Sequence, residues 1–191
     1  RCRQARGAGR AAERAAHPVT GDTGATAADD TGGRGFAAGT TGQPGASMQF
    51  QRALLAACMG WPEHVLKARG DDVFMGSPPL AFTFALGGLV LFPMHVGAST
   101  VMLEQASPPQ LLEAIPEFGV TILFTAPTSY RAIAEQARTR PLTDARGGTL
   151  RKCVSAGGAL PAAHRDLWEA ANGIQITDCV AATHTSPSFL A

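Results

Sequence analysis

Residues 120–128 read Val-Thr-Ile-Leu-Phe-Thr-Ala-Pro-Thr, a run of β-branched and apolar residues that ends at a proline. This composition predicts a strand over residues 120–125, followed by a turn at the proline. Residues 128–138 are then predicted to form a helix. The stretch is therefore interpreted as one strand-turn-helix unit.

The same unit recurs before and after this stretch. Further strands are predicted over residues 73–75, 99–103, 150–155 and 174–177, and further helices over residues 108–118 and 161–171. The apolar residues 81–94 are too many for one strand and predict a loop and a buried helix with Pro93 near its end. Alternation at this interval indicates an α/β fold in which helices flank a parallel sheet.

The carboxyl ends of the predicted strands are the expected place for a ligand. In open parallel sheets, ligands bind just outside these ends. Residues 125–128, 155–161 and 178–183 occupy such positions. These three stretches are candidate parts of a binding site.

Residues 1–35 differ from the rest in composition. They are dominated by Arg, Ala, Gly, Thr and Asp, and Val19 is their single large apolar residue. Such a segment buries too little surface to offset its chain entropy, so we predict a tail that is disordered or unrelated to the rest of the chain. A short helix or a nucleic-acid-binding arm over residues 1–14 is the less favoured alternative. The foldable part is expected to begin at Phe36.

The overall composition excludes several classes of partner. The net charge is +1 and 16% of the residues are charged, so nucleic acid is not implied. No apolar run has the length of a membrane span, and the N-terminus has no apolar signal core, so we expect a soluble, cytoplasmic chain. The four cysteines and five histidines are scattered, so we expect reduced thiols and no metal site on these residues.

A Gly/Thr stretch precedes the first predicted helix. Residues 36–48 read Phe-Ala-Ala-Gly-Thr-Thr-Gly-Gln-Pro-Gly-Ala-Ser-Met, and a helix interrupted at Trp61-Pro62 is predicted over residues 48–66. Backbone N–H groups and hydroxyls in this arrangement suit a phosphate. A flexible loop is the alternative, and the lysine of a Walker loop is absent.

Together these stretches resemble the AMP-forming adenylate-forming enzymes, and among them the aryl-CoA ligases acting on benzoate or 2-aminobenzoate. Residues 36–52 resemble the phosphate loop of that family, which usually reads Thr-Ser-Gly-Thr-Thr-Gly-x-Pro-Lys-Gly. The match over residues 72–165 is longer and more specific. The resemblance implies a partial large N-terminal domain over residues 36–185, an irregular end at 186–191, and no C-terminal domain with its catalytic lysine.

The resemblance also implies a reaction and its site. A small aromatic carboxylic acid would attack the α-phosphate of ATP, with Mg²⁺ present, and coenzyme A would then take the acyl group. The implied site residues are Gly39, Thr40, Thr41 and Gly42 for the ATP phosphates, Gly157, Gly158 and Ala159 for adenine, Phe82, Thr83 and Phe84 for the acid, and Thr183 for catalysis. Without the resemblance, these aromatic residues are equally well core residues, and a glycine turn after a strand occurs in any α/β protein.

The sequence departs from the family pattern at positions that matter for chemistry. Ala37 and Ala38 replace two hydroxyl residues, Gly45 replaces the loop lysine, and His184 replaces the glutamate that usually serves Mg²⁺. Gln49 and Gln51 replace histidines that are common in the aryl-CoA group.

Just upstream of the loop, Thr-Gly-Gly-Arg-Gly at residues 31–35 replaces an apolar strand, so we expect the loop to lack its supporting strand. We expect an isolated chain that is inactive as a ligase. A degenerate relative that binds nucleotide or an aromatic acid weakly is the alternative. A dinucleotide-binding domain is disfavoured, because no Gly-x-Gly-x-x-Gly opens a helix after a strand. The pattern does not distinguish among aromatic acids or oligomeric states.

Overall fold

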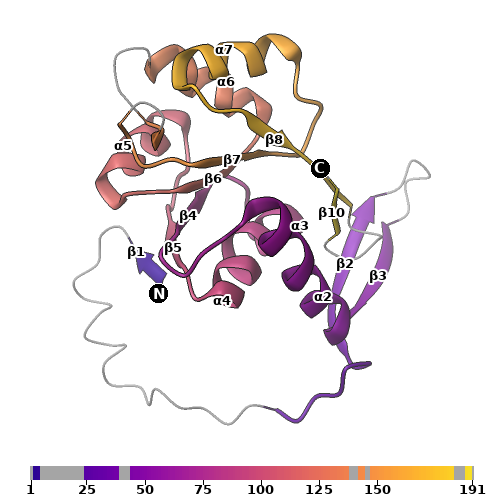
Figure 1. Cartoon of the computed structure of the whole chain (residues 1–191). Helices are drawn as coiled ribbons and strands as arrows, with labels where there is room; N and C mark the ends of the chain where they lie inside the picture. Colours follow the sequence, from indigo (N-terminus) through magenta and orange to yellow (C-terminus); the bar gives the residue numbers. More distant parts are fainter. Residues whose placement is uncertain are drawn as a thin grey trace.

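The computed structural model describes residues 2–4, 24–38, 44–137, 142–144, 147–182 and 188–190. Its centre is a six-stranded sheet in which every neighbouring pair is parallel (Figure 1). The strands, in spatial order, are β1 (Cys2–Gln4), β5 (Ser99–Met102), β4 (Val73–Gly76), β6 (Ile122–Thr125), β7 (Lys152–Ser155) and β8 (Ile176–Asp178). The predicted α/β fold with a parallel sheet is confirmed.

Helices cover both faces of the sheet, as Figure 1 shows above and below the strands. One face carries α5 (Pro108–Phe118), α6 (Pro127–Gln136) and α7 (Ala162–Asn172). The other carries α2 (Gln51–Trp61), η1 (Pro62–Leu66), α3 (Thr83–Ala85), η2 (Leu86–Leu91) and α4 (Phe92–Val96), of which η1 and η2 are π-helical. The strand and helix predictions from residue 73 onward are confirmed, with ends that move by one or two residues.

The two faces of the sheet belong to separate cores, because successive strand residues point to opposite sides. Leu123 and Cys153 pack under α5, α6 and α7, whereas Phe124 and Val154 pack on the other side. The Phe124 ring contacts Phe84 with ring centroids 5.4 Å apart. A methyl group on Gly88 would overlap the ring carbons of Phe124, so a glycine is required for η2 to approach β6 this closely.

Two predictions near the Gly/Thr stretch are wrong. A hairpin forms from β2 (Thr31–Ala38) and β3 (Pro44–Phe50), so the supporting strand is present and the helix begins at Gln51 rather than Met48. Main-chain hydrogen bonds hold this antiparallel pair, and they need no apolar side chain. The loop residues 39–43 lie outside the described residues, but their two ends are held by the Ala38 and Pro44 pair.

Further strands lie where irregular chain was expected. The strand β1 and the first part of β2 lie within residues 1–35, which were predicted to be a tail. The strand β10 (Ser188–Leu190) lies within the expected irregular end, residues 186–191, and pairs with β9 (Val180–Ala182) before it. The domain boundaries themselves remain a prediction.

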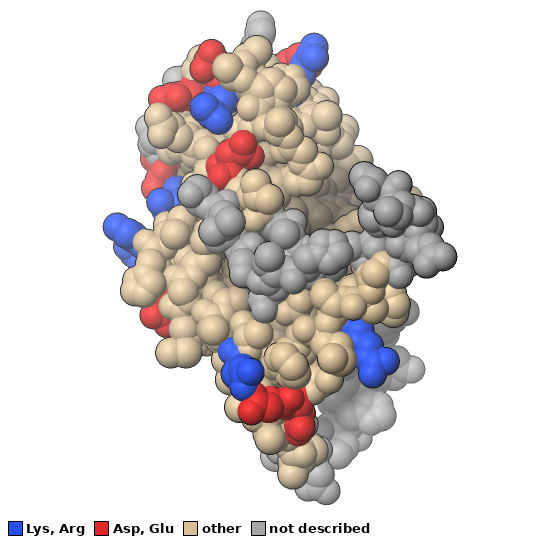
Figure 2. Space-filling model, turned by 90° about the vertical axis from the view of Figure 1, so that its right-hand side faces the viewer, with Lys and Arg blue, Asp and Glu red and all other residues tan. Residues whose placement is uncertain are grey.

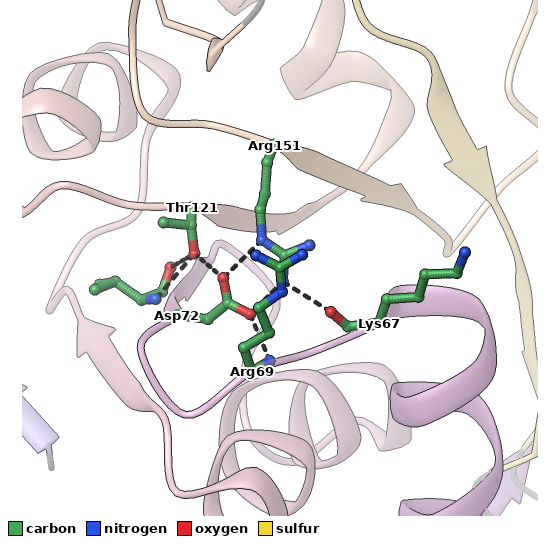
Figure 3. A network of polar contacts seen from close by, with 6 residues as sticks. Lys67, Arg69, Asp72, Thr121 and Arg151 are labelled. Carbon is green, nitrogen blue, oxygen red and sulfur yellow. Dashed lines mark hydrogen bonds and ion pairs between the residues drawn. The ribbon is translucent and has the colours of Figure 1, made fainter.

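A buried ion pair joins the amino ends of β4, β6 and β7 (Figure 3). Arg151 Nε donates to Asp72 Oδ1 at 2.8 Å, and a second guanidinium nitrogen pairs with Oδ2. The same carboxylate accepts hydrogen bonds from Thr121 Oγ1 at 2.7 Å and from the backbone N–H of Arg69 at 2.7 Å. Arg151 also donates to the Lys67 carbonyl at 3.0 Å. The network therefore joins segments up to 84 residues apart in sequence.

Candidate functional site

Among the described strands, a topological switch point lies between β4 and β6. From β4 the chain passes over one face to β5, and then returns over the other face through α5 to β6 on the opposite side of β4. Ligands of doubly wound sheets bind in the crevice outside the carboxyl ends of the strands at such a point. The residues that follow β4 and end β6 are therefore the first candidates for a binding site.

Two hydroxyl groups meet at this switch point. Ser77 follows β4 and Thr125 ends β6, and their oxygens lie 2.5 Å apart, a distance at which either can donate. The backbone N–H of Ser77 also donates to the Phe124 carbonyl at 3.1 Å. The two strand ends are thus joined by polar contacts at the point where a ligand is expected.

The row of polar strand ends continues toward β8. Thr125 lies opposite Ser155, and Ser155 lies opposite Asp178 in the parallel register. Thr125 and Ser155 are fully buried, and Ser155 Oγ has no hydrogen-bond partner among the described residues. A buried hydroxyl without a partner costs free energy unless a ligand or a water satisfies it. Ser155 Oγ is therefore a buried hydroxyl that the described residues leave unsatisfied.

The predicted adenine-binding turn lies immediately after β7. Gly157, Gly158 and Ala159 are exposed, and Gly157 has a φ of 88°. No atom lies within 4 Å of the position that a Cβ would take on either glycine. The turn thus presents open backbone beside the buried Ser155, and a flat ring could approach it closely.

The predicted acid-binding residues do not share one surface. Phe82 is 63% exposed, Thr83 is half-buried, and Phe84 is 6% exposed. The Phe84 ring packs against Phe124 in the core, so its contacts are those of a structural residue. Phe82 and Thr83 are the two of the three that a ligand can reach.

The remaining predicted site residues lie outside the described residues. They are Gly39, Thr40, Thr41 and Gly42 of the loop, and Thr183 with its neighbour His184. Gly45, where the family lysine is expected, is described and exposed, and no atom lies within 4 Å of its Cβ position. Space alone therefore does not exclude a longer side chain there.

A pocket of about 260 Å³ opens beside Ser77, at the carboxyl ends of β4 and β5. Its walls combine apolar and polar surface, and the apolar part includes Pro78, Leu89 and Leu103. Glu104 also lines the pocket and contributes a carboxylate. The pocket suits a small apolar group that carries a hydrogen-bond donor.

The described part of the chain offers hydroxyls and backbone, rather than thiolates or metal ligands, at this edge. Burial, and then the nearby charge of Asp178, raise the pKa of Cys179 to about 12. Burial likewise raises the pKa of Cys153 far above its ordinary value. Both thiols therefore stay protonated at neutral pH and are poor nucleophiles. Among the described residues, no three His, Cys, Asp or Glu side chains converge on a possible metal position.

The sequence predicted three stretches at strand ends, residues 125–128, 155–161 and 178–183, but not which of their side chains lie together. The neighbouring hydroxyls of Ser77 and Thr125, and the buried hydroxyl of Ser155, were not singled out. The sequence did contain a signal for these side chains, because each of three apolar strands has a serine or threonine at its end or directly after it. The pairing of these hydroxyls depends on strand register, which the sequence does not display.

A family model described as AMP-binding enzyme matches residues 7–191 of this sequence. The chain belongs to the AMP-binding enzyme family. The match begins within the segment that was expected to be an unrelated tail. The predicted resemblance to adenylate-forming enzymes is confirmed.

Individual relatives agree with this assignment. The anthranilate–CoA ligase of Pseudomonas aeruginosa is 30% identical over 82% of this chain and 29% of its own length. The 4-hydroxybenzoate–CoA/benzoate–CoA ligase of Rhodopseudomonas palustris is 32% identical over 87% of this chain and 30% of its own length. The chain therefore spans about 30% of the length of these curated relatives.

Solved structures of the family share the fold. The anthranilate CoA ligase AuaEII, crystallised with anthranoyl-AMP, matches with a TM-score of 0.75 and 33% identity over 87% of this chain and 32% of that one. ATP-bound MatB from Rhodopseudomonas palustris matches with a TM-score of 0.76 at 22% identity over 92% of this chain and 34% of that one, which supports the fold alone. No helix within the described ranges has both the length and the apolar character needed to cross a membrane.

Proposed function

We propose that this chain carries the acid- and nucleotide-binding part of an aryl-CoA ligase, acting on an acid of the benzoate or 2-aminobenzoate type. The observation that carries the proposal is the paired Ser77 and Thr125 at the topological switch point, beside the open turn at Gly157 and Gly158. The similarity to anthranilate and benzoate ligases supports this choice of acid class.

In this proposal the nucleotide lies along the carboxyl edge of the sheet. Adenine lies against the open backbone of Gly157, Gly158 and Ala159. The β- and γ-phosphates of ATP bind the loop that contains Gly39, Thr40, Thr41 and Gly42, whose ends are joined by the hairpin β2–β3. Thr183 contacts the α-phosphate and the acid carboxylate. These groups hold the reactants in line and lower the entropy cost of their encounter.

The aromatic acid lies between the switch point and α3. Phe82 and Thr83 are exposed enough to touch a ring. Thr125 and Ser155 are fully buried, and strand alternation turns them toward the α5, α6 and α7 side of the sheet, so neither faces the ring. In the reaction of this family, the carboxylate displaces pyrophosphate from ATP, and the thiol of coenzyme A then displaces AMP.

A Mg²⁺ site is not part of this proposal. The described residues hold no carboxylate cluster that fits the ion, and the family glutamate is His184 in this sequence. An imidazole is a poor ligand for this hard cation. No step is therefore assigned to a metal ion on this chain.

The second candidate is a relative that binds an aromatic acid or nucleotide without activating it. Gly45 and His184 favour it, because a cation and a carboxylate are missing from a site that handles a triphosphate. For both candidates we propose a cytoplasmic protein with a small-molecule substrate and no nucleic-acid partner.

Two assays separate the candidates. The first is ATP–pyrophosphate exchange with benzoate or 2-aminobenzoate and a control without acid. The second is calorimetric binding of a non-hydrolysable aryl-sulfamoyl adenosine, which mimics the aryl adenylate. Exchange above the control supports the ligase, and saturable binding without exchange supports the non-catalytic relative.

A matched pair of variants ties the binding to the carboxyl edge. Phe82→Ala should weaken analogue binding, because Phe82 is exposed at the proposed acid site, while Thr121→Val, at the amino end of the same sheet, should leave it unchanged. Absence of binding by the folded wild-type chain, checked by circular dichroism, would reject both candidates.

A further inference from the structure

One face of the helix formed by α2 and η1 is exposed along its whole length. Its residues recur at helical spacing and are Arg52, Leu55, Ala56, Met59 and Glu63. Leu55 is 61% exposed and Met59 is 59% exposed, although both are types that proteins usually bury. The opposite face is buried through Cys58, Trp61 and Leu66. The exposed residues thus form a narrow stripe, which we call the α2 stripe.

The α2 stripe has opposite charges at its two ends. Arg52 lies in the first turn and has a side chain that is 59% exposed, and Glu63 lies in η1 with a side chain that is 50% exposed. At 1.5 Å per residue, these ends lie roughly 16 Å apart along the axis. From its N-terminal to its C-terminal end, the stripe is therefore first basic, then apolar and finally acidic.

Both charged residues already have neighbours in the chain. Arg52 pairs with Asp29 and lies over the Phe50 ring, and Glu63 Oε1 lies 3.1 Å from His95 Nε2. A guanidinium has five N–H donors and a carboxylate has about four acceptor positions, so each can accept a further partner. The existing pairs hold the two side chains near the ends of the stripe.

We propose that the α2 stripe is the contact between two copies of this chain, which pack their α2 helices antiparallel about a two-fold axis. Reversing the stripe places Arg52 opposite Glu63 of the partner subunit and Leu55 opposite Met59 of the partner subunit. The small side chain of Ala56 at the centre allows the helix axes to approach closely. The same surface meets itself, as a two-fold dimer requires.

The charge order favours a second copy over an unrelated partner. A basic, apolar and acidic stripe is complementary to itself when reversed, and it forms two equivalent ion pairs flanking one apolar centre. On the face that it draws, Figure 2 shows basic and acidic groups interspersed, with no large region of one sign among the described residues. The stripe is short, so the dimer is weak, with a Kd on the order of 100 µM.

Charge reversal tests the pairing. Arg52→Glu and Glu63→Arg should each weaken dimerisation at least tenfold, because each homodimer then places like charges opposite one another at both ends. An equimolar mixture of the two variants should dimerise again, since one copy is acidic at both ends and the other is basic at both ends. The double variant R52E/E63R should also dimerise, and Glu113→Arg on α5 is the control that should change nothing.

Sedimentation equilibrium over a concentration range that brackets 100 µM measures these constants. Circular dichroism confirms that each variant is folded, and Leu55→Gln gives an independent way to weaken the apolar centre. A wild-type chain that stays monomeric throughout overturns the proposal. A dimer that survives both single reversals, or a mixture of the two variants that stays monomeric, overturns it as well.

Discussion

The two ends of the parallel sheet are built differently. At the amino ends, the Asp72 carboxylate is 3% exposed and receives hydrogen bonds from Arg151, Thr121 and the Arg69 backbone. At the carboxyl ends, the Ser155 hydroxyl is fully buried without a partner among the described residues, and the next turn exposes bare glycine backbone. At the amino end the charged group is satisfied within the chain, whereas the carboxyl end keeps one unsatisfied hydroxyl, on Ser155, beside an open glycine turn.

This difference separates the residues that hold the fold from those that meet a ligand. A satisfied buried charge is costly to disturb, because removing one partner leaves the other charge buried alone. An unsatisfied hydroxyl costs stability in the free protein and recovers it when a ligand binds. We therefore expect substitutions at the amino edge to change stability and substitutions at the carboxyl edge to change binding.

Asp72→Ala should have the largest effect on stability. It leaves the Arg151 guanidinium and the Thr121 hydroxyl without their shared partner, and we expect a loss of about 3–5 kcal/mol in the free energy of unfolding. Urea denaturation measures this loss. The double variant D72A/R151M should lose less than D72A alone, and an equal or larger loss would show that the pair is not the source of the effect.

Gly88→Ala should come next, with a loss of about 1–3 kcal/mol from overpacking against Phe124. Helix propensity alone predicts that alanine raises the free energy of unfolding by up to about 1 kcal/mol. The sign of the measured change therefore shows whether overpacking or helix propensity dominates. Thermal and urea unfolding measure it. In a Phe124→Leu background, Gly88→Ala should lower the free energy of unfolding by less than it does in the wild type. If the effects of the two substitutions simply add, the proposed contact between Gly88 and Phe124 is contradicted.

The amino edge should also respond to pH. Burial alone raises the pKa of Asp72, but hydrogen bonds from Arg151, Thr121 and the Arg69 backbone, with the Arg151 charge, outweigh it and hold that pKa below its usual range. The folded state therefore favours the carboxylate, and this stabilisation is present at neutral pH. It is lost as the pH falls below about 4. The difference in unfolding free energy between wild type and Asp72→Asn should shrink over that range, and a constant difference would contradict the assignment.

Ser155→Ala should have the smallest effect on stability, within about 0.5 kcal/mol of wild type or slightly stabilising. It removes a buried hydroxyl that has no hydrogen-bond partner among the described residues. Urea denaturation of Ser155→Ala and Asp72→Ala under the same conditions compares the two stability effects directly. A loss above about 1.5 kcal/mol would mean that Ser155 has a structural partner at this edge.

The order of strands and helices was predictable because the spacing of apolar residues within each segment indicates its secondary structure. The hairpin β2–β3 was not, because β2 contains three glycines and carries little side-chain pattern, while its main-chain pairing is invisible in the sequence. The pair of Asp72 and Arg151 was missed for a related reason, since 79 residues separate the partners. Long-range pairs depend on topology, which local patterns do not encode.

The candidate site was predictable in outline only. Topology located the strand ends, but Phe84 shows the limit of residue type as a guide, because an aromatic residue packs equally well in a core and in a pocket. The buried Tyr130 likewise bridges β6 and β7 by donating toward the Leu123 and Val154 carbonyls at 3.0 and 2.9 Å. Residue type alone does not distinguish such a structural role from a catalytic one.

The most direct test of the division between the two edges is an NMR titration of the ¹⁵N-labelled chain with an aryl-sulfamoyl adenosine. We predict saturable shifts of the backbone amides of Ser77, Thr125, Gly157 and Gly158, with the amides of Asp72, Thr121 and Arg151 unchanged. Shifts centred on the amino edge, or none at saturating analogue, would contradict the placement of the binding site at the carboxyl edge of the sheet.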